Sequence, residues 1–439
     1  MNRRRFLQTA AALAAPCVVP ASAFGATAPS NRIHVGCIGV GNQGSQVMKG
    51  FLQEADVRVV TVCDVNTASY GYKTASQYLG REPALKAVEA HYAQETRSGT
   101  YKGCEATTDF HRVLDRDDVD AVTIVVPDQW HGVMAIMAAA RGKDMYCEKP
   151  LSLTVADGRA MVEAVRRHGV ILQTGSHERS RPRTRFVCEL VRSGRIGRLT
   201  RIQTVVGPHN KTAPPAGWKP MPVPEGFDYD RWLGPAPWAP YHKDRCLYSF
   251  RFLLDYSGGQ VTNYGAHSLD IAQWGAGTEH TGPVEVEDLG STWPADGLFD
   301  VATTVHFRAR YAGGLELECI TRKDNMSCRF EGTDGVVEIG YGGFVTEPES
   351  LKRSVIGSGD VHLYPSDNHY RNFLDCVRSR CEPAAPVEIG HRSATVCHIA
   401  NIAMRLGRRL RWDPDAERFL GDDEANRMLS RPKRSPWSL

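Results

Sequence analysis

The sequence predicts two domains, an α/β domain with a doubly wound parallel sheet of the Rossmann type and then an α+β domain built on a largely antiparallel sheet. Three observations support this. Between residue 31 and about residue 150, short apolar runs alternate with helical stretches, as in a parallel sheet covered by helices. A glycine-rich turn, residues 39–44, joins the first apolar run to the first helix. Beyond about residue 180, apolar and polar residues alternate along runs separated by glycine-containing turns, which is typical of antiparallel strands.

The first domain is expected to span residues 31–153. Its strands are predicted at 33–38, 57–63, 121–126 and 145–147, with 170–174 further along. Helices are predicted at 45–53 and 132–141. A third helix is predicted from the N-cap residue Thr154 to His168, with Gly169 as its stop.

The second domain is expected to span residues 154–439. Its strands are predicted at 200–206, 302–311, 315–320, 328–331 and 336–339. Two late helices, 368–379 and 391–408, are expected to pack back on the first domain. Residues 208–240 hold nine prolines and three tryptophans, so they form a long irregular segment of the kind that often serves a function.

The glycine-rich turn predicts where a cofactor binds, because it fits the pattern G-x-G-x-x-G in a strand–turn–helix context. A pyrophosphate would lie at the positive end of the helix that follows. Asp64 ends the next strand, where a carboxylate binds the adenine ribose hydroxyls and repels a 2′-phosphate, so NAD is favoured over NADP. The turn residues expected at the cofactor are Gly39, Gly41, Asn42, Gln43 and Gly44.

The N-terminal segment, residues 1–30, is expected to be a targeting signal and a short linker. Residues 3–7 match the twin-arginine pattern R-R-x-F-L, an alanine-rich stretch follows, and residues 21–23 offer an A-x-A cleavage site. We therefore expect recognition by the twin-arginine translocase and a periplasmic or exported location. The chain has no apolar run of about eighteen residues, so no stable membrane anchor is expected.

Charge and cysteine content narrow the class of protein. The 439 residues contain 53 Lys+Arg and 50 Asp+Glu, and removal of residues 1–23, which hold three arginines and no acid, leaves the two totals equal. That balance argues against nucleic acid as a partner. The cysteines are widely spaced without a C-x-x-C pair, and several lie in strand-like runs, such as Cys37, Cys63, Cys147 and Cys319. They are expected to be buried free thiols.

Five segments of the chain carry a resemblance to a known family. They are the glycine-rich turn and residues 127–131 (PDQWH), 148–150 (EKP), 175–179 (GSHER) and 258–270 (GGQVTNYGAHSLD). Together they resemble the Gfo/Idh/MocA family of sugar and inositol oxidoreductases over nearly the whole chain after the signal. The resemblance implies that NAD is the cofactor, that a carbohydrate or cyclitol is the substrate, and that the chain forms a homodimer or homotetramer.

The resemblance also implies roles for single residues. The lysine of the EKP motif approaches both nicotinamide and substrate in that family, which points to Lys149, and its proline, here Pro150, is commonly in a cis peptide. Residues implied to lie beside the cofactor are Pro127, Trp130, His131, Glu148 and Lys149.

The family pattern D-x-x-x-H appears here as Asn263-x-x-x-His267. A neutral imidazole can take a proton from a sugar hydroxyl as hydride leaves the same carbon, so His267 is the expected base. Asn263 can bond a substrate hydroxyl but cannot carry charge. Asp270 lies one helical turn after His267, and is expected either to orient its ring or to be a charge on the helix face.

Two arginines are candidates to bind the sugar. Arg179 and Arg251 can donate hydrogen bonds to hydroxyl oxygens, although packing at a surface or interface is an equal alternative for each. His177 and Glu178 are adjacent, but no third ligand has suitable spacing, so no metal site is expected.

The implied activity is NAD-dependent hydride transfer at a CH–OH group. Since an exported enzyme is expected to work where no large pool of free NAD is present, three classes of protein remain open. The first is an oxidoreductase that keeps its NAD and moves hydride between two sugars. The second is a redox-neutral NAD-dependent glycosidase or lyase. The third is a non-catalytic, NAD-stabilised sugar-binding protein.

Overall fold

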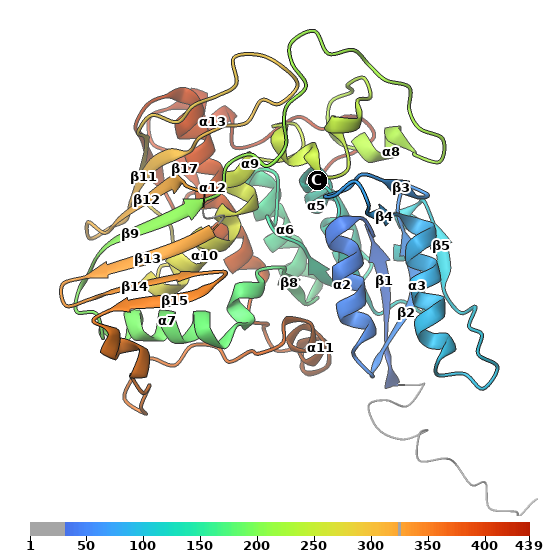
Figure 1. Cartoon of the computed structure of the whole chain (residues 1–439), viewed down its shortest axis with the longest axis horizontal. Helices are drawn as coiled ribbons and strands as arrows, with labels where there is room; N and C mark the ends of the chain where they lie inside the picture. The colour runs from blue at the N-terminus through green and yellow to red at the C-terminus, as the bar shows by residue number, and fades with distance from the viewer. Residues whose placement is uncertain (1–30, 324–325) are drawn as a thin grey trace, which may run out of the picture.

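The computed structural model describes residues 31–323 and 326–439, which form the two expected domains side by side (Figure 1). The predicted signal segment, residues 1–30, lies outside the described residues. Within the described part of the chain, no helix is long and apolar enough to cross a membrane.

The first domain contains the predicted parallel sheet. Its six strands run in the order β5-β2-β1-β6-β7-β8, and every neighbouring pair is parallel. The chain order reverses at β1, where ligands bind in sheets of this kind. The strands are β1 (Ile33–Ile38), β2 (Val57–Cys63), β5 (Glu105–Thr107), β6 (Ala121–Ile124), β7 (Asp144–Cys147) and β8 (Leu172–Thr174). Because β8 belongs to this sheet, the domain extends past the predicted boundary at residue 153.

Helices cover both faces of the parallel sheet. One face packs against α2 (Asn42–Leu52) and α3 (Arg81–Ala93), and the other against α5 (His131–Ala140) and α6 (Val155–His168). The predicted limits of α6 are confirmed: the Thr154 side chain accepts a hydrogen bond from the Asp157 N–H, and Gly169 takes a left-handed conformation at the end.

The second domain holds a nine-stranded sheet in the order β15-β14-β13-β9-β12-β11-β10-β16-β17. All neighbours are antiparallel except β9 and β12. The apolar residues of one face pack against α7 (Pro182–Arg192), α10 (Gly265–Ala276) and α12 (Val387–Leu406). The strands are β9 (Leu199–Val206), β10 (Glu285–Asp288), β11 (His306–Arg310), β12 (Glu316–Thr321), β13 (Met326–Gly332), β14 (Val336–Gly340), β15 (Gly343–Glu347), β16 (Leu410–Asp413) and β17 (Arg418–Phe419).

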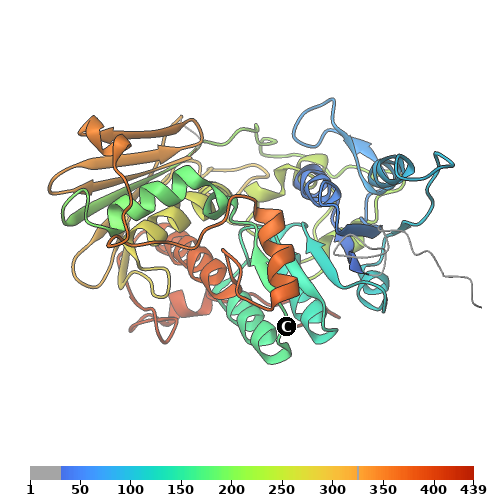
Figure 2. The same cartoon turned by 90° about the horizontal axis from the view of Figure 1, so that it is seen from below.

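Two late segments return to the first domain. Figure 2 shows α11 (His369–Ser379), in orange, beside the parallel sheet, where Phe373 packs edge-on against Phe51 of α2 with ring centroids 5.9 Å apart. The chain after α13 (Asp423–Arg427) also crosses back, since the Lys433 ammonium donates to the Asp157 carboxylate of α6 at 2.8 Å. The first domain is therefore packed against two segments from the last part of the chain.

The proline-rich segment between β9 and α9 (Gly259–Asn263) arches over the sheet edge, as the green loop at the top of Figure 1 shows. It has an aromatic core of its own, which includes Trp232 and Tyr256 at 4.9 Å. It also bonds to the end of β2, because the Asp228 N–H donates to the Val65 carbonyl at 3.0 Å. Its short helices are α8 (Tyr229–Leu233), η5 (Lys243–Arg245) and η6 (Ser249–Phe252).

All eleven cysteines in the described residues are unpaired, and all but Cys381 are buried. The expectation of free buried thiols is confirmed for Cys37, Cys63, Cys147 and Cys319. Burial raises the pKa of the Cys37 thiol to about 12, so this group stays protonated and unreactive.

Candidate active site

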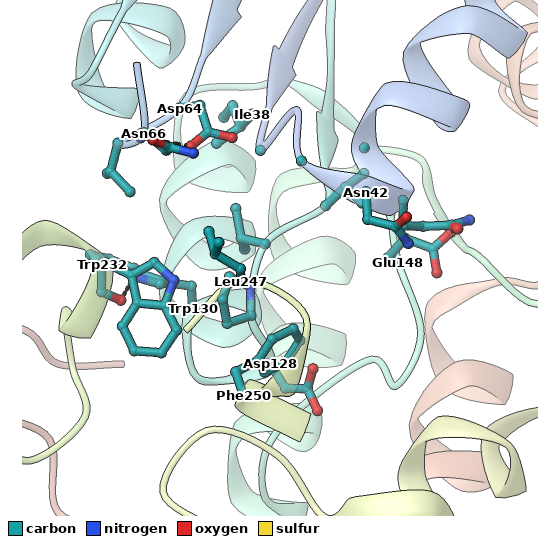
Figure 3. A pocket seen from close by; sticks show the side chains of 18 of the residues that line it. Ile38, Asn42, Asp64, Asn66, Asp128, Trp130, Glu148, Trp232, Leu247 and Phe250 are labelled. Carbon is teal, nitrogen blue, oxygen red and sulfur yellow. Dashed lines mark hydrogen bonds between the residues drawn. The ribbon is translucent and has the colours of Figure 1, made fainter. Parts of the chain in front are cut away.

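A cavity of about 540 Å³ opens at the carboxyl edge of the parallel sheet, with walls from both domains (Figure 3). Its floor is the end of β1 and the turn that follows, and its outer wall comes from the arching segment and from the start of α10. Most predicted site residues line it, namely Gly39, Gly41, Asn42, Gln43, Gly44, Asp64, Pro127, Trp130, Glu148, Lys149, Arg251, Asn263 and His267.

Two glycines of the glycine-rich turn leave no room for a side chain. Gly39 has φ +80°, and a Cβ on it would lie 2.2 Å from the Val125 carbonyl oxygen. A Cβ on Gly44 would lie 2.0 Å from the Gly39 oxygen. Helix α2 begins within the turn, at Asn42, with no side-chain cap and no acidic residue in its first turn. Its N–H groups and positive end are therefore open to a pyrophosphate, and the turn fits NAD.

The Asp64 carboxylate braces this turn. One oxygen accepts from the Val40 N–H and the other from the Asn66 N–H, each at 2.9 Å. Burial raises the pKa of Asp64, against the opposing effect of these two N–H groups and of Arg81. Asp64 thus lines the cavity and at the same time ties β2 to the glycine-rich turn.

A short hairpin covers the turn from above. It joins β3 (Ser69–Tyr70) and β4 (Tyr78–Leu79), and a Cβ on Gly41 would lie 2.7 Å from the Tyr72 ring. The Gln77 amide donates to the Asn42 side-chain oxygen at 3.0 Å. Gly41 is therefore required by a contact inside the protein, in addition to the close approach expected for a cofactor.

An aromatic wall closes one side of the cavity. Trp130 lies 5.4 Å from Phe110 and 4.6 Å from Trp437, both edge-on. Its indole N–H lies 3.1 Å from the carbonyl oxygens of Arg231 and Trp232, which join it to the arching segment. Figure 3 shows Trp130 and Trp232 together, across the pocket from Asn42 and Glu148. No sequence pattern around Trp437 indicated that it belongs to this site.

His131 differs from the expectation that it lies beside the cofactor. It is buried, and its ring nitrogens lie 2.8 Å from the Pro150 carbonyl oxygen and 3.0 Å from that of Val126. It is not among the residues that line the cavity. Its place is behind the wall, where it joins the strand end of β6 to the EKP motif, whose Lys149–Pro150 bond is cis as implied by the resemblance.

Glu148 is an ionised anchor beneath the cavity. Its Oε1 accepts from the Gln43 amide at 3.2 Å and lies 3.4 Å from His177 Nε2. Burial alone would raise the pKa of Glu148, but the contacts with His177, Lys149 and Gln43 outweigh it and lower the pKa to about 2. A Cβ on Gly175 would lie 2.8 Å from this carboxylate, which explains a glycine at the start of GSHER.

Lys149 and Asn263 are brought into direct contact from the two domains. The Lys149 ammonium donates to the backbone carbonyl of Asn263 at 3.0 Å and to its side-chain oxygen at 3.2 Å. Arg251 donates to the same side-chain oxygen at 2.9 Å. Burial lowers the pKa of Lys149, and the neighbouring Arg251 charge lowers it further, against Glu148. The lysine is therefore prepared to exchange a proton.

His267 lines the same cavity in a form suited to accept a proton. Burial lowers the pKa of His267 well below the ordinary value, and the Lys149 charge lowers it further, so its ring is neutral at pH 7. Its Nδ1 is buried and has no hydrogen-bond partner among the described residues. A buried polar atom left without a partner is costly.

Asp270 and Arg179 are corrections to the predicted site. The Arg179 guanidinium forms a buried ion pair with Asp270 at 2.8 Å and a second with Glu279 at 2.9 Å, and Ser393 donates to Asp270. Neither Arg179 nor Asp270 lines the cavity. Asp270 points to this network and not to His267, because residues three apart share a helix face only approximately and the arginine competes for the carboxylate.

His177 belongs to the support of Glu148. Its Nε2 lies 2.8 Å from the Tyr146 hydroxyl as well as near Glu148, while Glu178 bonds to Thr184 and Arg181. Across residues 31–323 and 326–439, no group of three potential metal ligands is close enough to hold an ion.

The fold and the cavity define a dinucleotide-binding protein with a second domain that completes a small-molecule site. The sequence model for "Oxidoreductase family, NAD-binding Rossmann fold" matches residues 33–176. That for "Oxidoreductase family, C-terminal alpha/beta domain" matches residues 205–439. The chain belongs to the Gfo/Idh/MocA oxidoreductase family, and its first domain binds NAD, which confirms the resemblance and the cofactor.

Three similar proteins illustrate the range of the family. A 2,7-anhydro-N-acetylneuraminate hydratase of Mediterraneibacter gnavus is 29% identical over 62% of this chain and 78% of its own length. A glycosyl hydrolase family 109 protein of Saccharopolyspora erythraea is 28% identical over 45% of this chain, which spans only 44% of that relative. The WlbA dehydrogenase of Bordetella pertussis, solved with NADH and UDP-GlcNAcA, covers 87% of this chain and 99% of its own at 20% identity and TM-score 0.61. This last likeness shows the fold.

Proposed function

We propose that this protein is an NAD-dependent oxidoreductase that moves hydride to or from a CH–OH carbon of a carbohydrate or cyclitol, and that it keeps its cofactor bound between turnovers. One observation carries the proposal. Lys149, Asn263 and His267 line the same cavity as the glycine-rich turn and Asp64. Proton-transfer groups and a dinucleotide-binding turn in one cavity are what this reaction requires.

Each of these residues has a separate role in the proposed reaction. NAD, when bound, supplies the hydride acceptor at the substrate carbon. Neutral His267 takes the proton from the hydroxyl on that carbon, because its low pKa keeps it unprotonated at pH 7. Lys149, held by Asn263, donates a hydrogen bond to the same substrate oxygen and can exchange its proton there. The glycine-rich turn, the positive end of α2 and Asp64 would hold the cofactor.

Retention of the cofactor is proposed because the N-terminal sequence indicates export and because two segments of the chain contact the residues of the cofactor region. The hairpin over Gly41 and the Trp437 contact with Trp130 both lie across the cofactor region. A retained cofactor requires that hydride removed in one step be returned in a later one. An exported enzyme with bound NAD satisfies this by acting on two sugars in turn.

A second candidate is a redox-neutral hydrolase or hydratase. The names of the hydratase and the glycosyl hydrolase given above denote the net addition of water, with no net oxidation. In such a reaction a C–O bond of the substrate breaks, water supplies the new hydroxyl and proton, and the oxidation state of the sugar is unchanged overall. The same three residues would serve it, since transient oxidation of a CH–OH carbon needs the same proton acceptor.

The test uses protein purified without added NAD. Heat-denatured protein should release NAD into the supernatant, and the native protein should turn over repeatedly on a panel of aldoses, keto-sugars, glycosides and cyclitols without added cofactor. Mass spectrometry of the products separates the candidates: paired oxidised and reduced sugars indicate hydride transfer between sugars, whereas bond cleavage with gain of water indicates the redox-neutral reaction. Turnover strictly proportional to added NAD, with accumulation of NADH, would instead identify a conventional dehydrogenase.

A further inference from the structure

The guanidinium of Arg251 reaches the cavity without a carboxylate partner. Its Nη1 donates to the side-chain oxygen of Asn263 and its Nε to the Tyr248 carbonyl, both at 2.9 Å. Among the described residues, no carboxylate forms an ion pair with it, and no protein acceptor takes a hydrogen bond from its Nη2. One edge of the guanidinium fork is therefore unused by the protein.

Asn263 is the reason that this charge is uncompensated. Its side-chain oxygen accepts from Arg251 and from the Lys149 ammonium, so two cationic groups converge on one neutral atom. An aspartate of the same shape would place a negative charge between them. The amide supplies hydrogen bonds but no charge.

The other carboxylates of this part of the cavity form no ion pair with Arg251, although the charge of Asp128 acts on it from a distance. Asp128 Oδ2 accepts from the Ser257 hydroxyl, and burial raises the pKa of this carboxyl. Glu148 is held by Gln43 and lies beside His177. A buried cation without a paired anion is unfavourable, and an anion brought by a ligand relieves that cost.

The orientation of Arg251 is determined before any ligand arrives. Its guanidinium carbon lies 3.9 Å from the centre of the Tyr248 ring, and Tyr248 is in turn bonded through its hydroxyl to Asn210 at 2.8 Å. A planar fork stacked on a fixed ring loses little conformational entropy on binding. Its geometry matches a planar carboxylate, which two parallel N–H groups can hold.

We propose that the substrate is an acidic sugar whose carboxylate pairs with Arg251, and that Asn263 sets this preference by leaving the guanidinium charge free. The inference rests on the proposed function only in taking this cavity as the substrate site. It assigns Arg251 and Asn263 as specificity-determining residues that distinguish a sugar acid from the corresponding neutral sugar.

The test measures binding and does not depend on turnover. Isothermal titration of the NAD-saturated full-length protein compares D-glucose with D-glucuronate and its methyl ester, and D-galactose with D-galacturonate. We expect each acid to bind at least about tenfold more tightly than its neutral partners, the effect of one charge-assisted pair. Glucose 6-phosphate tests whether any anion suffices, and tighter binding of this ester than of the acids overturns the carboxylate assignment.

Two variants test which residues cause the preference for acidic over neutral sugars. Arg251→Gln should abolish the difference between acid and neutral sugar. Asn263→Asp, which keeps the number of non-hydrogen atoms, should also abolish it, because the new carboxylate competes with that of the ligand. Arg353→Gln, at an exposed arginine of η7 (Glu349–Arg353) outside the cavity, is the matched control and should keep the full preference. Circular dichroism and NAD titration report that each variant is folded.

The outcomes separate this inference from the proposed reaction. Equal binding of acids and neutral sugars, or no binding of any acid by the unaltered protein, overturns it, as does a preference that survives in Asn263→Asp. Acid-selective binding that requires Arg251 supports it even if no cofactor chemistry is found. Turnover of neutral sugars alone would support the proposed reaction while rejecting the acidic substrate.

Discussion

The indole of Trp437 lies edge-on against the indole of Trp130, with ring centroids 4.6 Å apart. These residues are far apart in sequence, and they meet because the last segment crosses from the second domain to the first. Arg434 anchors that segment by donating from its backbone N–H to the Pro235 carbonyl at 2.9 Å. Both indoles line the cavity, so the last segment forms part of the cofactor site.

Trp437→Ala should speed the release of NAD. Edge-on aromatic packing contributes about 0.5–1.5 kcal/mol beyond burial, so a rise in the dissociation rate of about three- to tenfold is expected. Stopped-flow displacement of bound NADH measures it. Trp238→Ala, at an indole that is 69% exposed, is the control and should release NADH at the unaltered rate. Equal rates in all three proteins would remove Trp437 from the account of cofactor retention.

Gly44→Ala should disable cofactor binding while the protein remains folded. The new Cβ would lie 2.0 Å from the Gly39 oxygen, so the turn must shift away from the geometry that presents its N–H groups. We expect the affinity for NAD to fall by about tenfold or more. Gly359→Ala, where a Cβ meets no atom within 4 Å, should bind NAD normally. Normal binding in both variants would contradict the assigned cofactor turn.

Lys149→Met and His267→Ala should separate chemistry from binding. Each is expected to lower turnover by about a hundredfold or more, the usual contribution of a positioned proton-transfer group. NAD affinity should stay within a few-fold of the unaltered value, because neither side chain belongs to the glycine-rich turn. Full turnover in either variant would exclude that residue from the proton transfer.

Arg179→Met should lower stability and leave substrate binding unchanged. The loss leaves the buried Asp270 carboxylate without its cation, at a cost of about 3–5 kcal/mol in the free energy of unfolding. Arg195→Met is the comparison: Arg195 is 42% exposed and pairs with Asp360 at the surface, so a loss under about 1 kcal/mol is expected. Urea titration gives both values. A stable Arg179→Met protein with weakened sugar binding would restore Arg179 to the substrate site.

Stability should fall as the pH is lowered below about 6.5, the ordinary pKa of histidine. Burial lowers the pKa of His398 to about 3, so the folded protein holds this ring neutral while the unfolded chain takes up a proton. The contribution of neutral His398 to the free energy of unfolding is complete above about pH 6.5 and is lost as the pH falls toward 3. His398→Gln, which keeps a donor for the Ser152 carbonyl, should show a weaker decline of the urea midpoint between pH 7 and 4. An unchanged slope would indicate that other groups dominate the acid response.

Much of the architecture was predictable because it depends on neighbours in sequence. Strands β1 and β2 lie at the predicted limits, and Thr154 and Gly169 bound α6 as expected. Short strands such as β5 were missed, since three residues carry no clear alternation. Helix α10 was assumed around His267 and Asp270, but its limits were not predicted, because its residues are buried nearly all round and show no polar face.

The pattern of residues by itself determined the family, the cofactor turn and the substitution of Asn263 for an acidic residue. Each depends on residue types at fixed spacing, which a linear chain records directly. The tertiary structure alone decided that Asp270 serves Arg179 and that His131 supports Pro150 from behind the wall. It also decided that Asn263 joins Lys149 to Arg251. These pairings join segments that are distant in the sequence. Each side chain could pair with several residues of suitable chemistry, so only the packing of the two domains selects its partner.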